Sequence, residues 1–447
     1  MIQKRYCFDP LFYRFLLRRF LQISPTERSK TTRLIAGYLE NEGNYVRLIW
    51  YLLTVGEADQ ARLAFEQYAD DLYRALDQDS FRKMLEAFPE SFYDEEPKLT
   101  YYYALSTSLV RPVTTRKKLL DLVPVFLEAK DYEKVATIYA GLLINSLFYH
   151  RSTESMVGLV TRSSEFLSGY GTLIGEEQRE ILEVIIPLGK WWTGDDEDLA
   201  FRMALQAEET SFRFRNEEAY LCARFVLSRI YLEKGDFQEA RRLLHRTEAY
   251  LETQHVSGLF TALAVFYLGD MYFYVGEINT AVDRIEQELK QCPDDFAFRY
   301  YLEINLIIYT LYQEDISKAE SLYDLTENLE IEENLYVRYF SRFLVQMLIA
   351  YRNGNRQRAE YFCRRLLNEE NQALMRVDFP YSYLALAEVC LYLDRFDDVQ
   401  EILSPLLTDD FCRNHPYPSA SARSLMILLY EKTGRKDLIA SSATRML

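Results

Sequence analysis

The chain has few of the residues that interrupt helices. Its 447 residues include only 16 Gly and 12 Pro, which is a small supply for a protein built from hairpins and tight turns. Residues that favour helix, such as Ala, Leu, Glu, Arg and Gln, are abundant instead. The composition therefore argues against an all-β architecture and predicts an all-α fold.

Features typical of secreted and membrane proteins are also missing. The six Cys are scattered without a Cys-x-x-Cys pair, which makes a poor disulfide framework and suits a reducing compartment. The sequence contains no Asn-x-Ser/Thr sequon and no stretch with the charge and hydropathy of a signal peptide. No apolar run approaches the roughly 20 residues of a membrane span. We expect a cytoplasmic protein that does not enter a membrane.

The charge is of the wrong sign for a nucleic-acid-binding protein. With 52 Lys and Arg against 68 Asp and Glu, the net charge is −16, whereas proteins that hold phosphate backbones are usually basic. Only residues 1–35 differ, with eight basic and two acidic residues. That segment suits a nucleic-acid or membrane face, but more often such a pattern is a solvated helix face or a dock for an acidic neighbouring domain. We expect no direct nucleic-acid binding.

Residue sets that carry catalysis or hold a metal are not found. None of the four His belongs to an His-Glu-x-x-His motif, and the pair Cys412-x-x-His415 offers two ligands where a closed zinc site needs four. The sequence's one Gly-Lys pair, Gly189-Lys190, is followed by Trp191 and lacks the spacing of a phosphate-binding loop. We expect no enzymatic activity, no cofactor and no metal site.

What the sequence does contain is a repeat. The stretch Leu227–Leu244, LSRIYLEKGDFQEARRLL, returns in similar form from Leu268, Leu306, Gln346, Leu386 and Met426, at offsets of 41, 38, 40, 40 and 40 residues. The fourteenth position of each copy is small or aliphatic. Its occupants are Ala240, Ala281, Ala319, Ala359, Val399 and Ile439.

Each copy has the pattern of a helical hairpin. Apolar residues at helical spacing precede and follow a central turn, where Gly can adopt the left-handed conformation that ends a helix. A small residue at the fourteenth position lets the second helix approach the first. Because one hairpin cannot bury its apolar face alone, neighbouring hairpins must stack into an α-α superhelix. Less regular copies are expected at Ala129–Tyr132 and at Gly189–Trp192.

The turn Gly235-Asp236-Phe237, followed by Ala240, resembles the tetratricopeptide repeat (TPR). The period differs, since it lies near 40 residues and the usual repeat has about 34. The resemblance implies a TPR-like solenoid with a concave binding wall.

A second resemblance lies in the order of motifs in the N-terminal third. The order begins with Arg-Tyr-x-Phe-x-Pro-Leu-Phe-x-x-Phe-Leu and continues with a helical unit ending in Gly. It ends with Leu-x-x-Gly-Glu-x-x-x-Ala and then Leu-x-x-Phe-Pro…Pro-x-Leu. This order is similar to that of the MalT-like (LuxR-type) ATP-dependent transcriptional regulators. The matching residues are Arg5, Tyr6, Phe8, Pro10, Leu11, Phe12, Phe15, Leu16, Gly43, Gly56, Glu57, Ala61, Leu85, Pro89, Pro97 and Leu99.

This resemblance implies two regions and a function. Residues 1–95 would form a helical arm like the junction between the winged-helix part and the sensor, and residues 96–447 would form the TPR-like sensor superhelix. The phosphate-binding loop and the DNA-binding helix-turn-helix of such regulators are not in this sequence, so ATP hydrolysis and DNA binding are not implied for it. The chain is then either an excised sensor region or a natural protein that keeps only this region.

The binding wall can be placed by counting. In a TPR superhelix the first helix of each hairpin lines the concave side, so inward positions fall six and three residues before, and one and four residues after, the packing residues of the first helices. Apolar walls with a few polar groups are typical of ligand and peptide sites. The same aromatic side chains could instead simply fill the interior. The predicted groove residues are Phe225, Arg229, Phe266, Asp270, Phe273, Tyr301, Tyr351, Tyr381 and Glu388.

Two functions fit these features. The first is a non-enzymatic sensor of a MalT-like regulator, which binds a small-molecule inducer, a peptide or a regulatory protein more tightly in one arrangement than in another. The second is a free-standing adaptor that grips a peptide or a protein and is unrelated to transcription. Since the predicted wall has a single Arg, capture of a C-terminal carboxylate is not expected. Either protein could be a homo-oligomer.

Overall fold

The computed structural model confirms the all-α prediction. Every element in the part of the chain that it describes is a helix, and no strand occurs there. The described residues are 15, 18–20, 22–76, 78–108, 110–148, 153–193, 201–202, 204–206, 208–209, 217–253, 258–293, 296–328, 336–368 and 381–444.

The chain divides into two compact units. Unit 1 comprises Met1–Ser108 and Lys117–Val125, and unit 2 comprises Leu109–Arg116 and Phe126–Leu447. The boundary at residue 95 between a helical arm and a sensor, which the family resemblance implies, stays a prediction. Helix α8 (Pro112–Glu128) contributes residues to both units.

Unit 1 is a series of short helices around an aromatic core. The rings of Phe81, Phe88 and Tyr102 lie 6.1, 5.8 and 5.9 Å from the ring of Phe65. Its first helices are separated by turns at Gly43 and Gly56, both with positive φ. Its helices include α2 (Pro25–Asn41), α3 (Tyr45–Thr54), α4 (Ala58–Ala75), α5 (Gln78–Glu86), α6 (Phe92–Glu95) and α7 (Pro97–Thr107).

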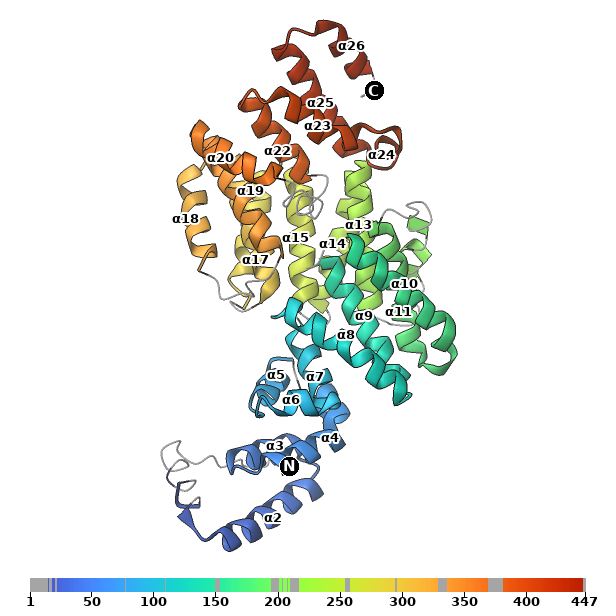
Figure 1. Cartoon of the computed structure of the whole chain (residues 1–447), viewed down its shortest axis with the longest axis vertical. Coiled ribbons are helices and arrows are strands. Elements are labelled where there is room, and N and C mark those ends of the chain that lie inside the picture. Colours follow the sequence, from blue (N-terminus) through green and yellow to red (C-terminus); the bar gives the residue numbers. More distant parts are fainter. Residues whose placement is uncertain are drawn as a thin grey trace. The chain divides into compact units, whose positions relative to one another are not determined.

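Unit 2 contains the hairpins that the 40-residue repeat predicts, preceded by less regular helices (Figure 1). The preceding helices are α9 (Tyr132–Phe148), α10 (Thr153–Tyr170), η1 (Gly171–Leu173) and α11 (Glu176–Thr193). The hairpins are α13 (Glu217–Lys234) with α14 (Phe237–Thr253), α15 (Gly258–Tyr274) with α16 (Ile278–Leu289), α17 (Ala297–Tyr312) with α18 (Ile316–Thr326), α19 (Tyr336–Arg352) with α20 (Arg356–Leu367), α22 (Tyr381–Tyr392) with α23 (Phe396–Leu403), and α25 (Pro416–Lys432) with α26 (Lys436–Thr444). Two short helices, η3 (Ser404–Leu407) and α24 (Asp409–Asn414), connect the last two hairpins.

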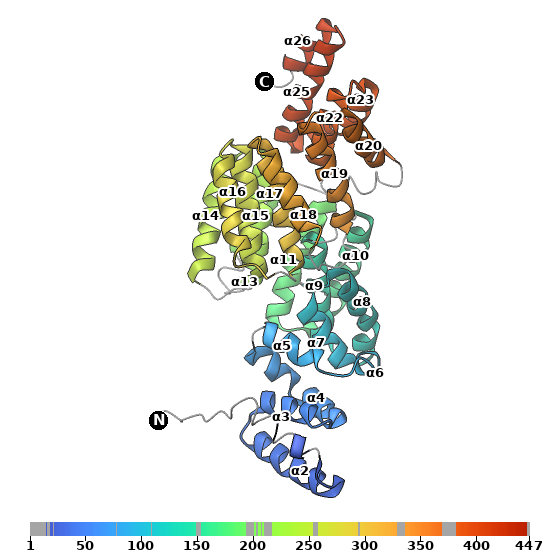
Figure 2. The ribbon, with the colours of Figure 1, turned by 90° about the vertical axis from the view of Figure 1, so that its left-hand side faces the viewer.

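The fourteenth position of the repeat is where the two helices of a hairpin meet. Its side chain is fully buried in the first five hairpins and partly buried at Ile439, in the last one. The first-helix packing position is equally tight. An added Cβ at Gly269 would lie 3.2 Å from Ile285 of its own hairpin and 3.4 Å from Tyr309 of the next. Neighbouring hairpins therefore pack directly on one another, and Figure 2 shows helices α13 to α18 side by side.

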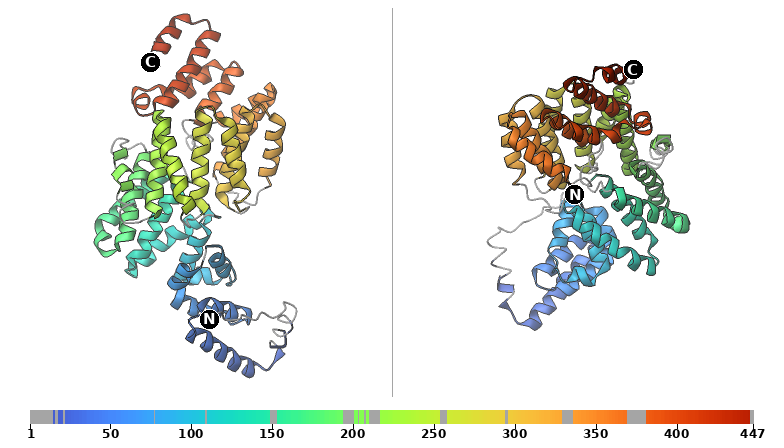
Figure 3. Two further views of the ribbon diagram at one scale, coloured as in Figure 1. Left: turned by 180° about the vertical axis from the view of Figure 1, so that it is seen from behind. Right: turned by 45° about the horizontal axis from the view of Figure 1, so that its top comes forward.

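The first helices follow one another through unit 2 and then meet the start of the series. Each of α13, α15, α17, α19, α22 and α25 contacts the next, and α25 also contacts α13. Figure 3 shows the C-terminal helices against the end of α13 when unit 2 is seen from behind. We call this meeting of α13 and α25 the closing contact.

The turn within each hairpin needs one residue with positive φ. Gly276 supplies it with φ +82°, and the amide of Glu277 then donates to the carbonyl of Tyr272 at 2.8 Å. In the next hairpin Glu314 occupies the same position with φ +64°. A side chain in the left-handed region costs roughly 1–2 kcal/mol, so this hairpin ends its first helix under backbone strain.

The place of Gly189 in the structure differs from the one that the sequence predicts. It was expected to mark a repeat, but it lies inside α11, which continues to Thr193. An added Cβ there would lie 2.6 Å from Val160 of α10. This Gly therefore serves the close approach of two helices. Ala200, forty residues before Ala240 and the small residue expected of this copy, lies outside the described residues. The turn expected at Ala129–Tyr132 is confirmed, with Lys130 at φ +58°.

The two turn positions predict opposite effects on stability. Replacing Gly276 with Ala should lower the free energy of unfolding by about 0.5–1 kcal/mol, because the left-handed strain exceeds the 0.4–1 kcal/mol gained by restricting the unfolded chain. Replacing Glu314 with Gly should raise it by a similar amount for the same reason. Urea denaturation of both variants measures the changes. The same sign for both would contradict the assignment of strain to Glu314.

Candidate functional site

The nine predicted groove residues lie on the first helices of unit 2, but they are not equally accessible. Phe225, Arg229, Phe266, Asp270 and Tyr301 are buried, whereas Phe273, Tyr351, Tyr381 and Glu388 are partly exposed. Their contacts divide them into three groups.

The first group is a buried aromatic row. The ring of Phe225 stacks on Tyr267 at 5.7 Å, and Tyr267 touches Phe266 edge to face at 5.5 Å. The row continues through Phe298, whose ring lies 5.6 Å from Phe266 and stacks at 5.2 Å on Tyr301. Phe225, Phe266 and Tyr301 thus pack against side chains of this chain, as the interior-filling alternative describes.

The second group surrounds Arg229. Its Nε lies 2.6 Å from Oε1 of Glu233, one helical turn away, and its Nη1 lies 3.8 Å from Oδ2 of Asp270 on α15. The guanidinium carbon also lies 4.8 Å from the ring centre of Tyr381 on α22, which is a cation–π distance. Asp270 in turn accepts a hydrogen bond of 2.6 Å from the hydroxyl of Tyr309 on α17. One buried cation therefore joins three first helices.

The third group is partly exposed, and we call it the inner-wall cluster: Phe273, Tyr312, Tyr351, Arg352 and Glu388. The carboxylate of Glu388 accepts hydrogen bonds from Tyr351 at 3.1 Å and from Tyr312 at 3.5 Å. Arg352 lies 3.6 Å from the same carboxylate and over both tyrosine rings, at 4.6 and 5.2 Å. The ring of Phe273 meets Tyr312 edge to face at 4.9 Å. Four successive first helices, α15, α17, α19 and α22, contribute to it.

The tyrosines of the inner-wall cluster are held in their neutral form. Burial and the nearby Glu388 carboxylate raise the pKa of Tyr312 to about 12, and the same two causes raise the pKa of Tyr351. Both hydroxyls therefore donate hydrogen bonds at physiological pH. The cluster combines apolar rings, hydroxyl donors, one carboxylate and one guanidinium, a set that can hydrogen-bond to a polar ligand and stack on it.

The closing contact adjoins the Arg229 group. Nδ1 of His415, at the start of α25, lies 2.6 Å from Oε2 of Glu233. Tyr417 of α25 packs edge to face on Phe237 at 5.1 Å and meets Tyr274 at 5.5 Å. The two ends of the hairpin series are thus joined by a chain of polar contacts, from the partly buried His415 through the buried Glu233 to Arg229.

The Glu233 carboxyl is ionised in this setting. Burial alone would raise its pKa, but the charge of Arg229 and the hydrogen bond from His415 outweigh burial, so the pKa of Glu233 lies below its ordinary value.

The motif Cys412-x-x-His415 does not form a metal site. Arg423 donates to the Cys412 sulfur at 3.1 Å, whereas His415 contacts Glu233. The two side chains do not converge on a shared ligand. Among the described residues no group of three or more His, Cys, Asp or Glu could hold a metal ion.

Counting along the repeat missed several residues of these groups, among them Glu233, Tyr274, Tyr312, Arg352 and His415. Arg352 follows the predicted Tyr351, and Glu233 lies four residues after Arg229, so the helical spacing of charges could have indicated both. Tyr274 and Tyr312 each lie one residue after a position that the counting placed on the inward side. His415 could not have been found, because its contact with Glu233 joins residues 182 positions apart.

Comparison with known proteins supports the fold. No protein-family model and no curated protein matches the sequence. Among solved structures, NprR in complex with its cognate peptide NprX has a TM-score of 0.52 and 14% sequence identity, and the match covers 82% of this chain and 98% of that chain. The chain has a TPR-like helical superhelix.

Two further structures match less closely. The apo form of the quorum sensor NprR from B. thuringiensis has a TM-score of 0.45 and 15% identity, over 83% of this chain and 99% of that chain. The APC/C hetero-tetramer Cut9–Hcn1 has a TM-score of 0.36 and 12% identity, over 93% and 86%. Within the described part, no helix combines the length and apolar character needed to cross a membrane.

The buried ion pair of Glu233 and Arg229 predicts a change in the free energy of unfolding. Replacing Glu233 with Gln should lower the free energy of unfolding at pH 7 by about 3 kcal/mol, because it leaves the buried Arg229 charge without its nearest partner. Urea denaturation measures the loss. Glu239→Gln is the control, since the exposed pair of Glu239 and Arg242 should contribute less than about 1 kcal/mol. Equal losses in the two variants would contradict the network.

The same variant should change the dependence of stability on pH. Since the folded-state pKa of Glu233 is lowered, its ionised form stabilises the wild type above the ordinary glutamate value of about 4.3. That contribution disappears as the pH falls through the folded-state value. The stability difference between wild type and Glu233→Gln should therefore shrink in acid. A difference that stays constant or grows would show that Glu233 is not held ionised.

Proposed function

We propose that this chain is a non-enzymatic TPR-like sensor module that binds a peptide or a segment of a regulatory protein at the inner-wall cluster. The observation that carries the proposal is the composition of that cluster. Four successive first helices each place a partly exposed aromatic or charged side chain in one contiguous group. An extended segment that crosses these helices could meet all of them in turn.

The chemistry of the cluster suits a segment with both polar and aromatic or apolar side chains. Tyr312 and Tyr351 offer large flat surfaces, and residues of this kind often contribute most of the energy at interfaces. Glu388 and Arg352 offer opposite charges 3.6 Å apart, and a ligand group of either sign can compete for the opposite partner. A small-molecule inducer would use the same groups. NprR, whose fold is similar, has been solved with a bound peptide, which supports the peptide as the first ligand class to test.

The finer part of the proposal is that the module belongs to a MalT-like transcriptional regulator. It rests on the motif order of the N-terminal third. Gly56 and Glu57 form the turn before α4, and Ala61 and Leu85 are fully buried in unit 1. In such a regulator, ligand binding would favour one arrangement of the neighbouring ATPase and DNA-binding parts over another. The alternative is a free-standing adaptor that uses the same wall.

The genomic reading frame distinguishes these two proposals. A phosphate-binding loop encoded upstream of residue 1 and a helix-turn-helix encoded downstream of residue 447 are what the regulator requires. If the frame holds neither, the adaptor is the better account, and the binding wall is unaffected.

The binding wall itself is tested with a matched pair of tyrosine variants. A random peptide library displayed on phage is panned against the full chain, and a selected peptide is titrated by calorimetry. Tyr351→Ala should weaken its binding at least tenfold, in the range expected of a central interface residue. Tyr361→Ala, at a tyrosine that is 53% exposed on the second helix α20, should leave binding unchanged. Failure to select any peptide, or equal effects of the two variants, would contradict the proposal.

A further inference from the structure

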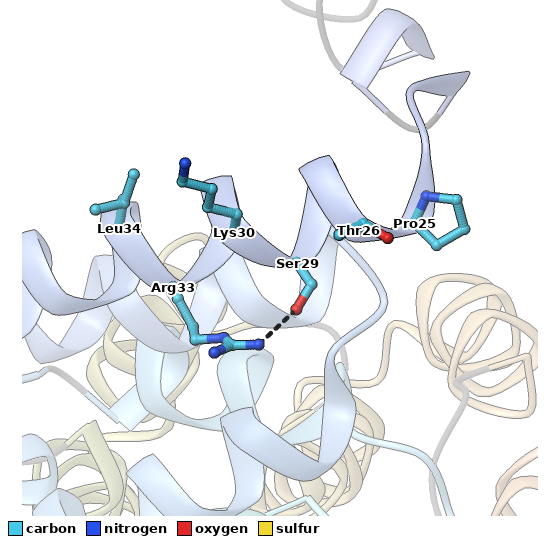
Figure 4. A pocket seen from close by; sticks show the side chains of 6 residues that line it. All are labelled: Pro25, Thr26, Ser29, Lys30, Arg33 and Leu34. Atoms are coloured by element: carbon cyan, nitrogen blue, oxygen red, sulfur yellow. Dashed lines mark hydrogen bonds between the residues drawn. The ribbon is translucent and has the colours of Figure 1, made fainter.

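Two features of the molecule lie outside the groups described above. One is a depression of about 620 Å³ on α2 of unit 1. Figure 4 shows that its described lining side chains all come from that one helix, where Arg33 donates to Ser29 at 3.3 Å. It has no second wall among the described residues to enclose a ligand. The other feature is buried and carries reactive groups, namely the thiols of Cys363 and Cys390 in unit 2.

These two thiols face each other between neighbouring hairpins. Cys363 lies on α20, the second helix of the fourth hairpin, and Cys390 lies on α22, the first helix of the fifth. The two helices contact each other. Both side chains are fully buried, and their sulfur atoms lie 3.3 Å apart. Since a disulfide bond is about 2.05 Å long, a shift of roughly 1.2 Å would join the sulfurs.

The repeat shows that packing at this junction does not by itself require two cysteines. Cys363 is the eighteenth residue of its copy, and Cys390 is the fifth residue of the next copy. At the other junctions between copies these two positions hold Leu244 with Tyr272, Ile285 with Thr310, Tyr323 with Ala350, and Leu403 with Tyr430. Side chains of very different size occupy the same place. The chemistry of sulfur, rather than its volume, therefore distinguishes the cysteine pair.

A zinc site does not account for the pair. Structural zinc takes four ligands from Cys, His and carboxylate side chains. In the described part of the chain no group of three or more such residues could hold a metal ion. The partner that each thiol does have is the other thiol.

The surroundings make the two thiols unequal. A hydrogen bond from Cys390 and the charge of Arg395 outweigh burial and hold the pKa of Cys363 below its ordinary value. The same hydrogen bond, together with burial, raises the pKa of Cys390. Because the thiolate is the form of cysteine that reacts with oxidants, Cys363 is the thiol that reacts first.

We propose that Cys363 and Cys390 are a modification site, at which a peroxide forms a reversible disulfide between the fourth and fifth hairpins. The Cys363 thiolate attacks one oxygen of hydrogen peroxide, so an S–O bond forms and the O–O bond breaks. The released hydroxide takes up the proton that Cys363 lost, which gives one water and a sulfenic acid. The Cys390 sulfur then attacks the Cys363 sulfur, the S–O bond breaks, and the hydroxide leaves as a second water with the Cys390 proton. Two thiols are oxidised, and one peroxide is reduced to two waters.

The disulfide would clamp two hairpins that are otherwise held by packing. It would close a loop between residues 27 positions apart, and such a cross-link stabilises a fold chiefly by restricting the unfolded chain. Since both sulfurs are buried, peroxide reaches them when this junction opens locally. The same two hairpins carry Tyr351 and Glu388 of the inner-wall cluster, so the bond would also restrict the movement of that wall. The modification itself does not depend on the ligand bound there.

Peptide mapping of the full chain tests whether the bond forms. The folded chain is treated with hydrogen peroxide, its remaining thiols are blocked with iodoacetamide in urea, and it is digested with trypsin. The peptides Ala359–Arg364 and Val377–Arg395 should appear linked, with a mass two hydrogen atoms below their sum. Dithiothreitol should remove the link. Recovery of the two cysteines as blocked thiols, as separate sulfinic acids or linked to other cysteines overturns the proposal.

Urea denaturation tests the clamp with a matched pair of variants. Oxidation should raise the midpoint of the wild type by roughly 1 M, from the loop constraint and the usual urea dependence. Cys390→Ala, which places there the residue that Ala350 supplies in the preceding copy, should lose this rise. Cys412→Ala, at a thiol whose sulfur contacts Arg423, should keep it.

Three results of that comparison overturn the proposal. They are a wild-type midpoint that oxidation leaves unchanged, a rise that persists in Cys390→Ala, and a rise that Cys412→Ala abolishes. Circular dichroism checks that the reduced variants are folded. If Cys390→Ala does not fold, the peptide map of the wild type decides.

Discussion

The fold of unit 2 depends on apolar surface that no hairpin can bury by itself. In the first five hairpins the two helices meet at a fully buried residue of the fourteenth position, such as Ala240 or Ala281, and the first helices of neighbouring hairpins contact one another. The contact of Gly269 with both Ile285 and Tyr309 shows how close the two levels of packing are. Stability in such an array is shared between neighbours. The position of every inward-facing side chain follows from that stacking.

The interior of unit 2 is joined by polar contacts as well as apolar ones. Arg229 contacts Asp270 of the neighbouring hairpin, and at the closing contact between α13 and α25 the hydrogen bond between His415 and Glu233 accompanies the packing of Tyr417 on Phe237. A buried ionic contact gains little over its solvated state, because the cost of removing charges from water offsets their attraction. The closing contact therefore adds little net free energy of folding, although removing one of its partners is costly. The inner-wall cluster lies on the helices between its two ends.

The repeat, its period and its turns were predictable because they depend on local patterns. A left-handed residue such as Gly276 and a small residue such as Ala240 leave a mark at fixed spacing in the sequence. Helical geometry also predicts an inward side of the first helices once one packing residue is known, and its use in binding stays a prediction. Whether an inward side chain is accessible was not predictable, and Phe225 and Tyr351 illustrate the difference. The first is buried and stacks on a ring of its own array, and the second is partly exposed.

The contact most remote from any local pattern is also the one on which the account depends most, namely the meeting of the two ends of the hairpin series. A double-mutant cycle with Glu233→Gln and His415→Ala measures it directly through the free energies of unfolding of the four proteins. The account predicts a coupling energy of about 1 kcal/mol or more, as expected of residues in direct contact within one network. A coupling energy within about 0.3 kcal/mol of zero, the value expected of distant and independent sites, would contradict it.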